Sequence, residues 1–150
     1  MSKPDDTAKL VLEVLVPFVH KLRQEFRLAI GGDLTTAQFR ILANVSRGND
    51  TASGIAKEYG VSQAAISKMI SALMSRGFLR RARPGPDRRH RRLALTLKGR
   101  AYYLDTRRQV RANLSRRIGR MSPRVQRDLW HGITAIAETF LQSGALEEGT

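Results

Sequence analysis

The chain has 150 residues, enough for one domain or one domain with an extension, and 41% of them are hydrophobic, which permits a buried core. The formal net charge of +14 and the pI near 11.4 favour an anionic partner, with nucleic acid first and a membrane surface second. The absence of cysteine excludes disulfides, a thiol redox switch and cysteine-ligated zinc, and it fits a cytoplasmic protein. The start MSKPDDT lacks the pattern of a signal peptide, and no apolar run approaches the roughly 20 residues that cross a bilayer, so we expect no membrane association.

The first predicted helix covers residues 8–30, where apolar side chains recur every three or four positions after a frayed polar tail at residues 1–7. Pro17 lies inside the repeat and should kink the helix or cost it one hydrogen bond, and Gly31 and Gly32 end it. The apolar stripe is broader and longer than a small domain requires. We therefore interpret residues 8–30 as an N-terminal dimerisation helix, with an ordinary core helix as the alternative.

A second helix is predicted directly after Leu34. Thr35 and Gln38 have the spacing of a capping box, in which each side chain bonds the backbone N–H of the other residue. The helix runs through Val45, and the polar residues 46–50 end it. It would be the first helix of a three-helix core.

Residues 52–73 predict two short helices joined by a tight turn at Gly60, because glycine adopts the positive φ that a sharp change of direction requires. Ser62 can cap the second helix with its hydroxyl, and Ala56 is small where the two helices would cross. The shared buried face would contain Ile55, Tyr59, Val61, Ile66 and Met69. This pattern is typical of a helix-turn-helix, and the alternative is an αα-hairpin with no nucleic-acid role.

The second of these helices leaves short polar side chains exposed, of the kind that hydrogen-bond to base edges or phosphates. They are Ser62, Gln63, Ala64, Ser67, Lys68 and Ser71. We expect all of them except Ser71 to read the major groove. At the start of the preceding helix, Thr51 and Ser53 could bind phosphate through their hydroxyls or through the helix N-terminus.

A β-hairpin is predicted next, so residues 34–97 together form a winged helix-turn-helix. Gly77 and Phe78 match a Schellman helix stop, and the strand candidates 79–83 and 93–97 flank turn residues at 84–87. Like charges packed so densely repel one another unless a polyanion neutralises them, so we expect the hairpin to face phosphates, with a solvated charged surface as the alternative. The expected wing contacts are Arg83, Arg88, Arg89 and Arg91, with Asp87 as the single acid.

Two further helices are predicted in residues 98–143. Thr96 would cap the first, which reaches about Met121, and Ser122 followed by Pro123 would open the second. Apolar residues line the last helix at Val125, Leu129, Ile133, Ile136 and Phe140. With residues 8–30 these helices would expose more apolar surface than a single domain normally leaves in water, so we expect a two-fold homodimer.

The predicted fold class is mainly α with a small β-hairpin: a winged helix-turn-helix core flanked by long N- and C-terminal dimerisation helices. Residues 98–143 would complete the dimerisation region. A two-fold dimer would present its recognition helices to successive major grooves about 34–36 Å apart, which suits double-stranded DNA with a pseudo-palindromic operator.

This order of motifs resembles the MarR family of bacterial transcriptional regulators over nearly the whole chain. The resemblance is carried by LTTAQFRIL, LMSRGFLRR and DRRHRRLALTLKG. It implies that the first and last helices form the dimer, that the recognition helix enters the major groove, and that Asp87 steadies the wing while Arg89 enters the minor groove. The sequence departs from the family pattern at Pro84 and Pro86, which should stiffen the wing tip, and in its richer arginine content.

Many members of that family bind small aromatic or phenolic anions in a crevice between the dimer helices and the winged core. By resemblance, we hypothesise an effector site in which arginines interrupt an apolar stripe close to aromatic residues. Its candidate residues are His20, Phe39, Arg40, Tyr103, Arg107 and Arg108. The alternative is that these arginines are solvated or contact DNA.

Other chemistry finds no support in the sequence. The three histidines His20, His90 and His131 do not have metal-ligand spacing, the carboxylates form no evident catalytic pair, and no glycine-rich phosphate loop is present. We therefore expect no enzyme activity, no metal and no cofactor. The expected function is a dimeric sequence-specific DNA-binding regulator, acting as a repressor; the alternatives are a nonspecific architectural DNA- or RNA-binding protein and a protein-interaction adaptor.

Overall fold

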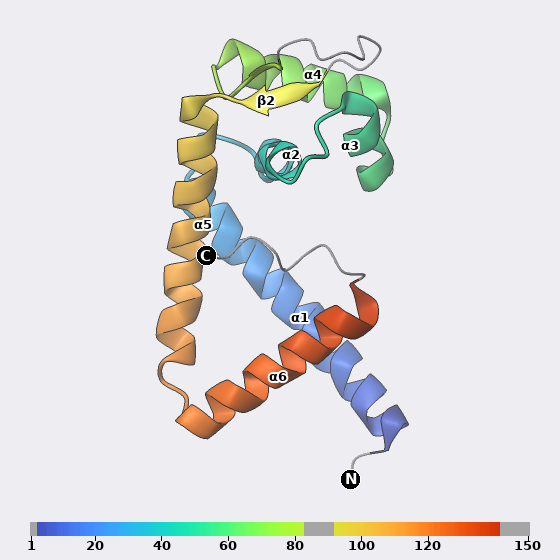
Figure 1. The fold of residues 1–150 in the computed structure, drawn as a ribbon, viewed down its shortest axis with the longest axis vertical. Coiled ribbons are helices and arrows are strands. Elements are labelled where there is room, and N and C mark those ends of the chain that lie inside the picture. Colours follow the sequence, from blue (N-terminus) through green and yellow to red (C-terminus); the bar gives the residue numbers. More distant parts are fainter. Residues whose placement is uncertain (1–2, 83–91, 142–150) are drawn as a thin grey trace. The chain divides into compact units, whose positions relative to one another are not determined.

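A computed structural model describes residues 3–82 and 92–141 (Figure 1). The described residues form six helices and one two-stranded hairpin, as the sequence predicts for a mainly α protein. The elements are α1 (Pro4–Ile30), α2 (Thr36–Ser46), α3 (Ala52–Tyr59), α4 (Gln63–Ser75), β1 (Leu79–Arg81), β2 (Leu93–Leu95), α5 (Leu97–Ile118) and α6 (Pro123–Phe140). The chain divides into two compact units, residues 1–110 and 111–150, and α5 runs from the first into the second.

Helix α1 begins earlier than the sequence pattern predicts, because residues 4–7 are helical rather than a frayed tail. Pro4 occupies the first helical position, where its missing N–H costs nothing, and two acids in the first turn favour the positive end of the helix dipole. The helix continues through Pro17 as one element. Gly31 ends it in the left-handed region at φ 65°, with its N–H donating to the carbonyl of Leu28 at 3.2 Å.

The core of the first unit lies where α2 packs against α1, α4 and β2, and where α3 packs against α4. Figure 1 shows α2 end-on, with α3 and β2 around it. The fully buried large apolar side chains are Ile41, Leu42, Ile55, Ile66 and Leu73. The predicted shared face of the helix-turn-helix is confirmed at Ile55 and Ile66 but is wrong at Val61, which is 45% exposed because it lies in the turn beyond the end of α3.

Local signals set the helix ends of this unit as predicted. The capping box of α2 is present, with the Gln38 N–H donating to Thr35 Oγ1 at 3.2 Å and the Thr35 N–H donating to Gln38 Oε1 at 3.0 Å. Gly60 has φ 63° at the turn between α3 and α4, and Ser62 accepts the Ala65 N–H at 3.2 Å. The start of the recognition helix is therefore fixed by hydrogen bonds within its own first turn.

The end of α4 and the start of the hairpin form the predicted Schellman stop. Gly77 adopts φ 75°, its N–H donates to the Met74 carbonyl at 3.0 Å, and the Phe78 N–H donates to the Leu73 carbonyl at 2.9 Å. Phe78 is buried and packs edge-on against Tyr102 of α5, with ring centroids 5.4 Å apart. The same residue therefore joins the end of α4 to β1 and to α5.

The hairpin is antiparallel, with Leu79 opposite Leu95 and Arg81 opposite Leu93. The predicted second strand extended to residue 97, which is wrong. Thr96 instead caps α5 by accepting the Gly99 N–H at 3.0 Å, and Leu97 begins that helix with 90% of its surface exposed. Because Thr96 is already committed to the helix start, the strand ends one residue before it.

The second unit contains the end of α5 and all of α6. Helix α5 ends at Ile118 rather than near Met121, and Ser122 caps α6 by accepting the Val125 N–H at 3.4 Å, with Pro123 in the first turn as predicted. Helix α6 exposes large apolar side chains at Val125, Leu129, Trp130, Ile133 and Phe140. The assignment of α1 and of residues 98–143 to dimerisation stays a prediction.

Candidate nucleic-acid interface

The outward face of α4 carries every residue that the sequence predicts for major-groove readout. Ile66, Ile70 and Leu73 point the opposite face into the core. This orientation leaves exposed Ser62, Gln63, Ala64, Ser67 and Lys68. Ser62 uses its oxygen to accept the Ala65 N–H, so its hydroxyl hydrogen remains able to donate to an acceptor outside the helix.

The N-terminal end of α3 supplies the two predicted phosphate contacts. Thr51 caps the helix by accepting the Gly54 N–H at 3.1 Å, and Ser53 is exposed with its hydroxyl 3.5 Å from Thr51 Oγ1. A Cβ at Gly54 would overlap Oδ1 of Asn49 and would lie 2.9 Å from Thr51 Oγ1, so the cap closes tightly only over glycine. The two hydroxyls are thus held together at one helix end.

The surface around these elements has one sign of charge. From Tyr59 to Leu104 the sequence contains eleven Lys and Arg residues and a single acid, Asp87. The described cations of this segment are Lys68, Arg76, Arg80, Arg81, Arg92, Lys98 and Arg100, all of them exposed. Such a surface attracts a polyanion in water and favours contacts with phosphates.

The base of the wing is anchored to the loop before α3 by Asp50, a residue that the sequence analysis did not single out. The Leu93 N–H donates to the Asp50 carbonyl at 2.8 Å, and the Arg92 guanidinium lies 3.8 Å from the Asp50 carboxylate. The Ala82 N–H donates to the Arg92 carbonyl at 3.0 Å and continues the pairing. No local pattern reveals Asp50, because its partner is more than forty residues further along the chain.

The predicted wing contacts lie outside the described residues. They are Arg83, Asp87, Arg88, Arg89 and Arg91. Their roles therefore stay predictions.

A buried polar network behind α3 was also missed by the sequence analysis. Asn44 is fully buried, donates to the Arg40 carbonyl at 3.0 Å and to Tyr59 Oη, and accepts from Asn49 Nδ2 at 3.0 Å. Asn49 also donates to Glu58 at 2.8 Å, so the network ties α2, the following loop and α3 together. Burial, opposed by the nearby Arg40 guanidinium, raises the pKa of Tyr59 above its usual value.

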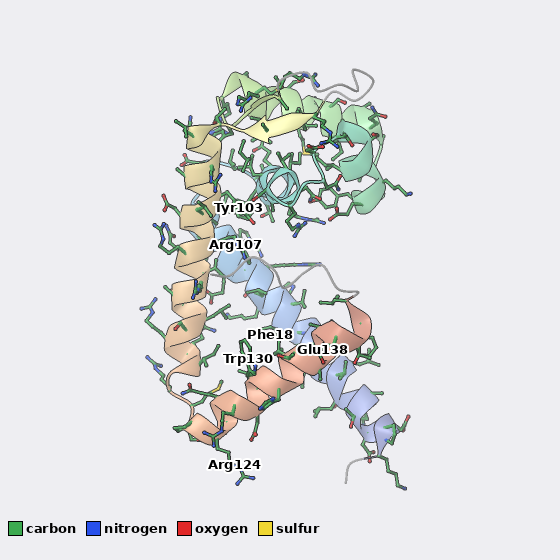
Figure 2. All side chains as sticks on the ribbon, viewed as in Figure 1. Phe18, Tyr103, Arg107, Arg124, Trp130 and Glu138 are labelled. Carbon is green, nitrogen blue, oxygen red and sulfur yellow. The ribbon has the colours of Figure 1, made fainter. Side chains whose placement is uncertain are left out.

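The predicted effector residues are only partly brought together. Phe39 and Tyr103 are buried with ring centroids 5.8 Å apart, and the guanidinium of Arg107 donates to Tyr103 Oη at 2.9 Å and lies 5.5 Å from its ring centroid. Figure 2 labels Arg107 and Tyr103 on neighbouring turns of α5. These three residues form an aromatic and cationic cluster, hereafter the Tyr103 cluster.

The other three candidates have different partners. Arg40 stacks over Tyr59 at 4.0 Å from the ring centroid, Arg108 pairs with Asp105 at 2.7 Å, and His20 is exposed and bonded to Gln24 at 3.2 Å. Sequence spacing brought them into the hypothesis, but each of these contacts is made away from Tyr103. Their assignment to an effector site stays a prediction.

The described residues show no metal centre and no membrane span. Within residues 3–82 and 92–141, no three His, Cys, Asp or Glu side chains gather closely enough to hold a metal ion. In the same part of the chain, every helix is too short or too polar to cross a bilayer.

Comparison with known proteins places this geometry. Residues 32–90 match the model of the MarR family. A MarR family protein from Bacillus stearothermophilus superimposes with a TM-score of 0.78 at 14% identity, over 91% of this chain and 97% of that one. A search of curated protein sequences gave no significant match.

Two similar solved structures contain a bound molecule. FabT of Streptococcus pneumoniae, in complex with DNA, matches with a TM-score of 0.66 and 23% identity over 88% of this chain and 95% of that one. A MarR family protein of Mycobacterium tuberculosis, in complex with p-aminosalicylic acid, matches with a TM-score of 0.61 and 23% identity over 83% of this chain and 96% of that one. At these identities the likeness establishes the fold.

Proposed function

The chain belongs, through residues 32–90 and through its fold, to the MarR family of DNA-binding transcriptional regulators, and from that premise we propose that it is a homodimeric, sequence-specific repressor of the cytoplasm. Repression needs only that the protein occupy an operator that polymerase also requires. The observation that carries the proposal is the outward face of α4, where Gln63 and Lys68 stand exposed among small residues and no acid.

On this proposal α4 enters the major groove and the hairpin enters the minor groove. The amide of Gln63 can bond two edges of an adenine, while the small side chains of Ala64 and Ser67 allow the helix backbone to approach the bases. Thr51 and Ser53 would position the protein on the phosphates without reading sequence. The DNA complex of FabT supports this mode of binding for a protein of the same fold.

The proposed dimer uses α1 and α6. In α1, Leu10, Leu12, Val14 and Val16 are each more than half exposed, and α6 exposes Trp130 at 72%. Such apolar surface favours association, and a two-fold dimer is the commonest form of it. Sedimentation of the purified chain tests this step, because a monomer at micromolar concentration would overturn it.

The DNA proposal is tested by selecting genomic duplexes on the purified protein and measuring their affinity for variants. Gln63→Ala should lose about 1–3 kcal/mol on the selected duplex, relax discrimination at one base position and leave binding to random duplexes unchanged. Gln109→Ala, which removes an exposed amide from α5, is the matched control and should change neither value. Equal losses on selected and random duplexes for Gln63→Ala would contradict base readout by α4.

We also propose that a small aromatic anion releases the operator by binding beside the Tyr103 cluster. The support is the pairing of a guanidinium with two aromatic rings at Arg107, Tyr103 and Phe39, and the bound p-aminosalicylic acid of the Mycobacterium tuberculosis protein. Titrating the protein–operator complex with p-aminosalicylate should release DNA from the wild type and from Arg108→Gln, but not from Arg107→Gln. Normal release from Arg107→Gln would sink this part of the proposal.

The second candidate function is nonspecific, architectural binding to DNA or RNA, which the net charge of +14 favours. Each neutralised phosphate adds about −0.9 to the slope of log affinity against log salt, and both candidates predict a steep slope. They differ in competition. A repressor should prefer the selected duplex over bulk DNA by about a thousandfold or more, whereas an architectural protein should show no preference.

A further inference from the structure

Six exposed arginines gather around the turn between α5 and α6, in the second unit and outside the winged helix. They are Arg111, Arg116, Arg117, Arg120, Arg124 and Arg127, hereafter the basic turn. Residues 111–127 contain no acid, no lysine and no aromatic residue, and the first acid after them is Asp128. The proposed operator binding uses none of these arginines.

Helix stability accounts for only part of this cluster. Arg116 and Arg117 lie in the last turn of α5, where positive charge is favourable, and Arg116 donates to Asn113 on the same helix. Arg124, however, occupies the first turn of α6, where positive charge opposes the helix dipole and that turn contains no acid to offset it. Figure 2 shows its side chain extending from the beginning of that helix.

The ion pairing around the basic turn is too weak to explain the arginines at the start of α6. Arg124 lies 3.9 Å from the carboxylate of Asp128, and both side chains are largely exposed, at 86% and 69%. Pairs of this kind contribute little, whereas Arg124 and Arg127, three residues apart on one helix, repel each other. A bound polyanion would remove that repulsion.

We propose that the basic turn is a second, sequence-independent binding site for the phosphates of duplex DNA, which lets one protein hold a second DNA segment. Exclusive use of arginine suits phosphate, because the guanidinium fork can bond two of its oxygens at once. The lack of aromatic residues argues against single strands, whose unpaired bases need rings to stack on. This site goes beyond the proposed operator binding and does not depend on it.

The first test removes three charges from the basic turn. The variant Arg116→Gln, Arg120→Gln, Arg124→Gln is compared with a matched control, Lys21→Gln, Arg23→Gln, Arg27→Gln, which removes three exposed charges from α1. The readouts are the salt slope on bulk duplex DNA and the capture of a labelled second duplex by protein bound to an immobilised duplex. Far-UV circular dichroism and urea unfolding check the fold of both variants.

The expected result separates the two variants. The basic-turn variant should lose about tenfold or more in capture of the second duplex, and its log–log salt slope should be shallower by about 2 or more. The α1 control should keep wild-type capture. If the triple variant does not fold, Arg120→Gln alone, at an exposed position between the helices, should make the slope shallower by about 1. Unchanged slope and capture in a folded variant would overturn the proposal.

A second arm separates this site from the operator site. Gln63→Ala with Lys68→Ala should lose preference for the selected duplex yet still bind bulk duplex through the basic turn. Loss of all duplex binding in this variant would overturn the second site while leaving the operator proposal standing. Structured RNA or vesicles with anionic lipid, offered as competitors at equal phosphate concentration, should displace the second duplex poorly; better displacement than by duplex DNA would also overturn the assignment.

Discussion

The winged core and the outer helices use apolar residues in opposite ways. In the core, Leu42 and Leu73 have no exposed surface, so their stabilisation is realised within one chain. In α1, Leu12 is 68% exposed and Leu28 is 79% exposed, so their apolar surface gives a single chain little. The difference teaches that the core can fold on its own contacts, whereas the apolar residues of α1 gain stability only when something covers them.

The largest expected effect breaks the core side of this comparison. Leu42→Ala should lower the free energy of unfolding by about 2–5 kcal/mol, because it deletes buried methyl groups and leaves a cavity. Leu12→Ala should cost less than about 0.5 kcal/mol at low protein concentration and more as the concentration rises. Urea unfolding at two concentrations measures both, and a concentration-independent cost at Leu12 would contradict the contrast.

Next in size is the buried polar network, which has no counterpart on the exposed surface of α5. Asn44→Ala should cost about 2–3 kcal/mol, because the Tyr59 hydroxyl and the Asn49 amide lose a partner in a buried place. Gln109→Ala, at an exposed amide, serves as control and should stay within about 0.5 kcal/mol of the wild type. Thermal unfolding of the two variants compares them directly. A loss at Asn44 as small as that at Gln109 would show that the network contributes little.

Two helical glycines sharpen the comparison further. A Cβ at Gly99 would overlap the backbone carbonyl of Phe78, so Gly99→Ala should destabilise the protein by about 1–3 kcal/mol. A Cβ at Gly132, in α6, would meet no described atom within 4 Å, so Gly132→Ala should stabilise the protein by about 0.4–1 kcal/mol through the unfolded state. Opposite signs in urea unfolding are expected. The same sign at both positions would contradict the geometry.

The smallest expected effect is a pH dependence at the network. Because burial raises the pKa of Tyr59 in the folded state, the folded protein holds this proton more tightly than the unfolded chain does. Stability from this group is therefore complete below about pH 10, the ordinary tyrosine value, and is lost as the pH rises through the folded pKa. Unfolding measured from about pH 8 to about pH 11 should show a shallower decline in Tyr59→Phe than in the wild type. An identical decline would remove Tyr59 as its source.

Helix ends and turns could be predicted from the sequence because their chemistry is local. The caps at Thr35 and Ser62 and the stop at Gly77 each depend on residues within three or four positions. Contacts between distant segments could not be predicted in this way. Periodicity placed Arg40 beside the effector candidates, but the ring of Tyr59, nineteen residues away in sequence, holds its guanidinium.

The same limit applies to the candidate interface. The exposed polar face of α4 follows from helical spacing, since Ile66 and Ile70 fix which side is buried. The anchoring of the wing by Asp50 does not follow from any pattern, because it joins a loop to a strand that comes much later in the chain. Residues that act through their neighbours along the chain were therefore found, and those that act across the fold were not.

The side chain of Phe78 is a mechanical joint. Its N–H closes the end of α4, its carbonyl accepts the N–H of Thr96, and its ring rests against Tyr102 and beneath the ammonium of Lys98, 4.4 Å from the ring centroid. With a glycine at 99, the backbone of α5 sits directly on this joint. A torque applied to α5 is consequently delivered to the C-terminal end of α4 and is not dissipated in a slack connection.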